Sequence, residues 1–67
     1  MDPNANLKEQ DRLLKQYDRN RRTRHVWMRE HYARLTELRE ALASWLDNGG
    51  FEPDWTLAPR AASFYGK

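Results

Sequence analysis

The residues best suited to chemistry lie in a short basic run, Arg19-Asn20-Arg21-Arg22-Thr23-Arg24, and Trp27 and Arg29 follow it closely. A guanidinium group donates paired hydrogen bonds to phosphate oxygens and stacks on nucleobases, and an indole can stack beside it. The run therefore predicts binding of an anionic partner, nucleic acid in first place, through five arginines: Arg19, Arg21, Arg22, Arg24 and Arg29. There are two alternatives. The partner is an acidic protein surface, or the run is a solvated turn that binds no partner.

The charge of the chain is unevenly distributed around this run. Between Arg12 and Arg34 there are eight basic residues and two acidic ones, which gives this segment a net charge of +6. The remaining residues carry a net charge of −4, and the whole chain carries +2. A molecule polarised in this way is typical of proteins that approach a polyanion with one end.

A second group of candidate residues consists of aromatic side chains near the C-terminus. Trp45, Phe51 and Trp55 bracket the Gly49-Gly50 pair, and two further aromatics come shortly before the last residue. Either Phe51 or Trp55 folds back on Trp45 and closes a helix end, or the aromatics anchor a protein partner. The second interpretation makes the chain an adaptor or inhibitor of a host protein, with these interaction residues: Trp45, Phe51, Trp55, Phe64 and Tyr65.

Catalytic and metal-binding patterns are missing from the sequence. His25 and His31 are six residues apart, which puts them on different sides of a helix, and Ser44 and Ser63 have no base at a recognisable spacing. We therefore expect no catalytic activity, no metal ion and no cofactor. The lack of cysteine, of a transmembrane-length apolar run and of a signal peptide predicts a cytoplasmic protein that does not engage membranes.

The elements that must position these residues are helical. Asp2-Pro3 can start a helix, Asp47-Asn48-Gly49-Gly50 can end one, and apolar residues between them recur every seven positions. Arginines occupy the centre of this apolar seam, where burial would be costly. The pattern favours an all-α, two-helix antiparallel hairpin that turns within residues 19–23. One long helix in a coiled-coil dimer is the alternative.

The predicted organisation is a helical hairpin over residues 1–50 and an irregular aromatic segment over residues 51–67. The expected helices run over residues 4–18 and 24–47, with ion pairs at helical spacing: Asp11–Lys15, Asp18–Arg22 and Glu30–Arg34. A chain of 67 residues with two helices buries little apolar area. We therefore expect a homodimer or a partner-bound subunit.

Both ends of the chain contain distinctive sequence motifs. These are Asp2-Pro3-Asn4-Ala5-Asn6-Leu7 at the start and Trp45-Leu46-Asp47-Asn48-Gly49-Gly50-Phe51-Glu52-Pro53-Asp54-Trp55 near the end. In these residues the chain resembles a group of short, functionally uncharacterised proteins of actinobacteria and their phages. The resemblance implies two helices joined by a loop, and an origin more than an activity. The basic run itself resembles the arginine-rich helical segments of small RNA-binding proteins.

Overall fold

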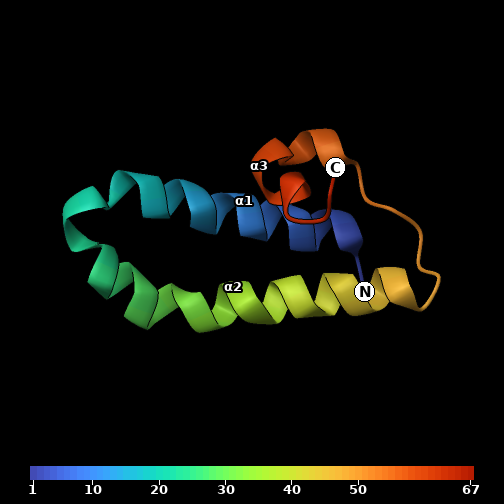
Figure 1. Ribbon diagram of the computed structural model, residues 1–67, viewed down its shortest axis with the longest axis horizontal. Coiled ribbons are helices and arrows are strands. Elements are labelled where there is room, and N and C mark those ends of the chain that lie inside the picture. The colour runs from blue at the N-terminus through green and yellow to red at the C-terminus, as the bar shows by residue number, and fades with distance from the viewer.

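Two long antiparallel helices form the frame of the protein. The computed structural model describes all 67 residues, and its elements are α1 (Pro3–Arg19), η1 (Arg21–Thr23), α2 (Arg24–Asp47), η2 (Trp55–Leu57) and α3 (Pro59–Ser63). Figure 1 shows α1 and α2 side by side, with the C-terminal segment folded back over α1. The predicted all-α hairpin is confirmed, and the single long helix is not formed. None of the helices combines enough length and apolar character to cross a lipid bilayer.

The turn of the hairpin contains neither glycine nor proline. The backbone N–H of Asn20 donates to the carbonyl oxygen of Gln16 at 3.0 Å, and the N–H of Thr23 donates to the carbonyl oxygen of Asn20 at 3.0 Å. All residues of the turn keep negative φ angles, because only Gly49 and Gly66 have positive ones. A 3₁₀ turn therefore reverses the chain without the special conformation that usually selects glycine.

The outer ends of the two helices are closed by local hydrogen bonds. An oxygen of the Asp2 side chain accepts from the backbone N–H groups of Asn4 and Ala5, at 3.0 and 3.2 Å. At the end of α2, Gly49 has a φ of 82°, and the N–H of Gly50 donates to the carbonyl oxygen of Trp45 at 2.8 Å. These are an N-cap and a Schellman C-cap, so both predicted helix boundaries have a physical cause.

One hydrophobic core runs along the hairpin. It contains three leucines of α1 (Leu7, Leu13 and Leu14) and, from α2, Trp27, Leu35, Leu38 and Leu42. The spacing of these residues places them on one face of each helix, and the buried side chains of Asn6 and Gln10 interrupt that face on α1. Ala58 and Ala61 from the C-terminal segment complete the same core.

The C-terminal segment is more ordered than the sequence analysis predicted. Only part of it is irregular, because Trp55–Leu57 and Pro59–Ser63 are helical. Asp54 caps the first of these turns by accepting from the N–H of Thr56 at 3.1 Å, and Pro59 occupies the first position of α3. Buried alanines then allow α3 to approach α1 closely. These short helices are stabilised by packing, which periodicity could not reveal.

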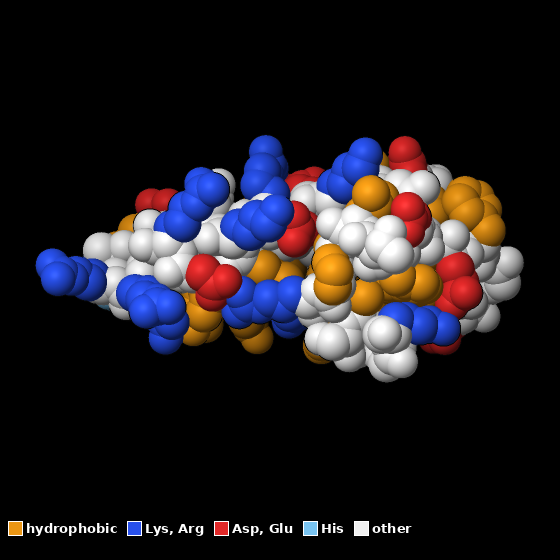
Figure 2. Space-filling view, turned by 90° about the horizontal axis from the view of Figure 1, so that it is seen from above, with side chains coloured by type: hydrophobic (Ala, Val, Ile, Leu, Met, Phe, Trp, Pro, Cys, Tyr) orange, Lys and Arg blue, Asp and Glu red, His pale blue; other side chains and the backbone are white.

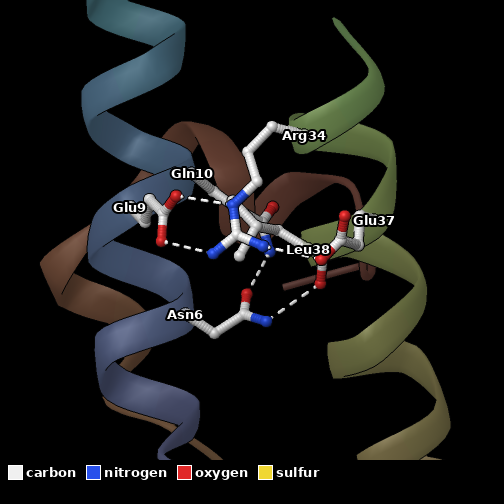
Figure 3. A network of polar contacts seen from close by, with 6 residues as sticks. All are labelled: Asn6, Glu9, Gln10, Arg34, Glu37 and Leu38. Carbon is white, nitrogen blue, oxygen red and sulfur yellow. Dashed lines mark hydrogen bonds and ion pairs between the residues drawn. The ribbon is translucent and has the colours of Figure 1, made fainter. Parts of the chain in front are cut away.

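A buried polar network joins α1, α2 and the C-terminal segment, and Figure 3 shows the part of it between α1 and α2. The Asn6 side chain donates from Nδ2 to the carbonyl oxygen of Leu38 at 3.0 Å. Gln10 Nε2 donates to Asn6 Oδ1 at 2.7 Å and to the hydroxyl oxygen of Tyr65 at 3.0 Å. Burial raises the pKa of Tyr65 above its usual value. Both amide nitrogens are thus hydrogen-bonded across the elements and fix their register, whereas Gln10 Oε1 is buried without a partner.

An ion-pair cluster lies at the edge of the same interface (Figure 3). Arg34 donates from Nε and Nη2 to the two carboxylate oxygens of Glu9, at 2.8 and 3.0 Å, and from Nη1 to Glu37 at 2.7 Å. The hydrogen bonds from Arg34 lower the pKa of Glu9. This bidentate pair crosses between the helices, so it replaces the predicted pair of Arg34 with Glu30.

Candidate nucleic-acid interface

Four arginines converge at the tip of the hairpin. Arg19 ends α1, Arg21 and Arg22 lie in η1, and Arg24 begins α2. All four side chains are exposed, and none makes an ion pair within the chain. Figure 2 shows Lys and Arg side chains projecting from the narrow left end of the molecule, which is the tip in Figure 1. We call these four residues the arginine tip.

Arg29, the fifth predicted binding residue, lies on α2 beyond the tip and is also exposed without an ion-pair partner. The guanidinium carbon of Arg24 sits 4.6 Å from the centre of the Tyr17 ring, so this side chain has a defined resting position. The other tip arginines have no comparable contact. They are free to adapt to a ligand.

No carboxylate neutralises the arginine tip. Asp18, the nearest acid on α1, is paired with Arg60 from α3 instead of with Arg22 as predicted. No side chain caps the start of α2, and its first turn contains no acid. The positive end of the α2 dipole therefore adds to the arginine charges.

Trp27 is unavailable as a stacking platform, contrary to the sequence analysis. Its side chain is only 3% exposed, and Nε1 donates to the carbonyl oxygen of Leu13 at 3.0 Å. Its ring lies edge-on to Tyr17, with the ring centres 5.0 Å apart. The spacing of Trp27 from the other apolar residues of α2 was the available signal for burial. An exposed anion site at the tip must therefore act through guanidinium groups and backbone amides.

The predicted protein-interaction residues fall into two groups of ring contacts: Trp45 with Phe51, and Tyr65 with both Trp55 and Phe64. Trp45 packs edge-on against Phe51, with ring centres 5.4 Å apart, and its Nε1 donates to the Phe51 carbonyl oxygen at 2.9 Å. Trp55 and Tyr65 are half-buried against each other, with ring centres 5.4 Å apart. Phe51 thus closes the helix end, as one of the two interpretations expected, and Trp55 does not. Only Phe51 and Phe64 remain largely exposed, at 64% and 58%.

An open groove of about 400 Å³ lies on a different part of the molecule, between α2 and the residue that follows α3. Tyr32 and Phe64 are its exposed aromatic walls, and the guanidinium carbon of Arg39 lies 4.3 Å from the centre of the Phe64 ring. The other lining residues are Thr36, Glu40 and Ala43. Sequence reasoning missed this groove, because it depends on where the C-terminal segment folds back.

Comparisons with protein-family models, with curated proteins and with solved structures find no match to this chain. The resemblance to short actinobacterial and phage proteins therefore stays a prediction. The case for a function depends on the arrangement of the side chains themselves.

Proposed function

We propose that this protein is a small, non-enzymatic accessory protein of the cytoplasm that binds nucleic acid through the arginine tip. The observation that carries the proposal is the absence of any neutralising carboxylate around four exposed arginines held on one tight turn. Arg29 is exposed on α2 beyond this turn and is not needed for the arginine tip. A surface such as the arginine tip neutralises several phosphates at once and releases their counterions, which is the main source of sequence-independent affinity.

The arrangement favours contact with the phosphate backbone over contact with bases. Trp27 is buried and Tyr17 lies beneath Arg24, so the tip offers no free aromatic ring to a base. Single-strand binding proteins depend on such rings for much of their affinity. Duplex phosphates, read through their charge and spacing, are therefore the ligand we propose, without sequence preference.

Fluorescence anisotropy with labelled duplex DNA, duplex RNA and single strands, measured over a salt series, tests this function. If about four phosphates are contacted, log K should fall against log salt with a slope of about −3.6. Replacing Arg21 and Arg22 by alanine should weaken binding and flatten the slope by about two units.

The matched control replaces Lys8 and Arg12 by alanine, because this pair removes the same charge from exposed positions of α1 away from the tip. It should weaken binding much less. Equal losses in the two variants, or no salt-sensitive binding by the wild type, would contradict a site at the arginine tip.

A further inference from the structure

One side of α2 faces away from the core and carries a regular row of residues, which we call the outward stripe: His25, Arg29, Tyr32, Thr36, Glu40, Ala43 and Asp47. Successive members are three or four residues apart, so they share one face of the helix. The buried residues of α2 occupy the opposite face. Five of its seven residues are exposed, whereas Thr36 and Ala43 are half-buried, so most of the stripe is left uncovered.

The middle of the outward stripe is apolar and hollowed. Tyr32 is 49% exposed and forms one wall of the groove that Phe64 closes on the other side. Met28, one helical turn before Tyr32, is 44% exposed as well. Exposed large apolar side chains beside a groove mark a surface that another molecule covers.

The charges of the stripe are ordered along its length. Arg29 and His25, which is charged only when protonated, lie in the first half of α2, whereas Glu40 and Asp47 lie in the second half. None of the four is paired with an opposite charge elsewhere in the chain. Thr36 stands midway, eleven residues from either end of the stripe. When two copies of the stripe lie antiparallel, the basic half of each therefore faces the acidic half of the other.

We propose that the outward stripe binds the same stripe of a second copy of this chain, antiparallel, with the two-fold axis at Thr36. In this register Tyr32 faces the partner's Glu40, and His25 faces the partner's Asp47. Arg29 faces the partner's Ala43 and lies one helical turn from the partner's Glu40. A two-fold interface is isologous, so every one of these contacts occurs twice.

Self-complementarity singles out a second copy as the occupant. A parallel arrangement would place Arg29 against Arg29 and Glu40 against Glu40, which costs free energy. The side chains at Thr36 and Ala43 are small, so the two helices can approach to the usual axial separation of about 8–10 Å. Tyr32 of each copy then reaches the groove of the other.

Pairing of this kind places the two arginine tips at opposite ends of the dimer. Each Arg24 lies twelve residues from Thr36, so the two positions are separated by about 36 Å along the helix direction at about 1.5 Å per residue. One turn of duplex DNA spans about 34–36 Å. The two arginine tips of the dimer would therefore be about one duplex turn apart and could contact the same side of a duplex at successive turns. This consequence rests on the proposed function as well as on the dimer.

Charge exchange tests the interface without nucleic acid. In sedimentation equilibrium, the wild type should form a species of twice 8.1 kDa at micromolar to millimolar concentration. Arg29→Glu or Glu40→Arg alone should weaken the dimer about tenfold, because each creates two like-charge contacts. The double variant restores opposite charges across the axis and should recover the dimer. Glu30→Arg changes the net charge by the same amount as Glu40→Arg but lies outside the outward stripe, so it should have little effect on the dimer.

A cross-link tests the register. The chain contains no cysteine, so Thr36→Cys introduces a single thiol at the proposed axis. Two such thiols would lie within disulfide reach, and oxidation should give a covalent dimer. Ala41→Cys, on another side of α2, should not cross-link. A wild type that stays monomeric throughout, or equal cross-linking of both variants, would overturn the proposal while leaving the nucleic-acid function untouched.

Discussion

Trp27 Nε1 donates a hydrogen bond of 3.0 Å to the backbone carbonyl oxygen of Leu13, which ties the first turns of α2 to α1. The bond lies just inside the hairpin tip, and the indole is buried between the two helices. It therefore holds the start of α2 against α1 near the arginine tip.

The variant Trp27→Phe separates support from ligand contact. It keeps an aromatic ring in the core and removes the hydrogen bond, so the free energy of unfolding should fall by about 1–2 kcal/mol. Nucleic-acid affinity and its salt slope should stay close to the wild type below the unfolding transition. Urea denaturation and fluorescence anisotropy measure the two quantities. Full stability combined with lost binding would mean that the indole contacts the ligand.

The hairpin could be predicted because its signals are local and repeated. Helix boundaries at Asp2 and Gly49 have characteristic residues, and charged side chains at the centre of the seam indicate a turn there. The ion pairs were less predictable. Lys15 pairs with Asp11 at 2.9 Å as expected, but Arg34 finds a bidentate partner on the other helix. Spacing along one helix cannot reveal a competing partner in the tertiary structure.

Exposure of the arginine tip could be foreseen, because charged side chains at the centre of the apolar repeat indicate both a turn and its contact with solvent. Docking of the C-terminal segment could not be foreseen equally well. Alanines and prolines such as Ala61 and Pro59 carry no periodic signal, yet small side chains allow α3 to lie against α1. Asn6 and Gln10 look like ordinary surface residues in the sequence, and only the folded chain shows that they are buried.

The Asn6 side chain of α1 hydrogen-bonds both to the Leu38 carbonyl oxygen in α2 and to the side chain of Gln10. In Asn6→Ala, Gln10 Nε2 loses its shortest hydrogen bond inside the core. We expect the free energy of unfolding to fall by about 1–3 kcal/mol, because a buried polar group is left with fewer partners. Thermal unfolding followed by circular dichroism measures this loss. Asn20→Ala, at an exposed position, is the comparison and should cost less.

Acid should weaken the contact between Glu9 and Arg34. The pKa of Glu9 in the folded protein is lowered from 4.5 by the hydrogen bonds from Arg34, so folding favours the charged carboxylate. This contribution is present above the unfolded pKa and is lost as the pH falls through the lower, folded pKa. Glu9→Gln should therefore be less stable than the wild type near neutral pH, with the difference vanishing in strong acid. Glu30→Gln, at a carboxylate that does not contact Arg34, is the control and should stay close to the wild type in stability near neutral pH.

Gly50 should tolerate no larger side chain. A Cβ atom at this position would overlap the indole of Trp45, which packs over the Schellman turn. Gly50→Ala must displace that ring and weaken its contacts with Phe51, at a cost of about 1–3 kcal/mol. Gly49→Ala should cost about 1–2 kcal/mol for a different reason, the positive φ of 82°. Only Gly50→Ala should alter tryptophan fluorescence in the folded state.

The pairing of Asp18 with Arg60 should control the potential at the arginine tip. Arg60→Ala removes a positive charge that lies away from the tip, but it also leaves the Asp18 carboxylate without its partner beside Arg19. Affinity for duplex DNA should therefore fall by more than in Lys8→Ala, which removes one charge from an unpaired position. Asp18→Ala should raise the affinity, because the tip loses its nearest acid. Anisotropy at fixed salt measures all three variants. If Arg60→Ala and Lys8→Ala were equivalent, only total charge would matter, and the α3 pair would have no influence on the proposed site.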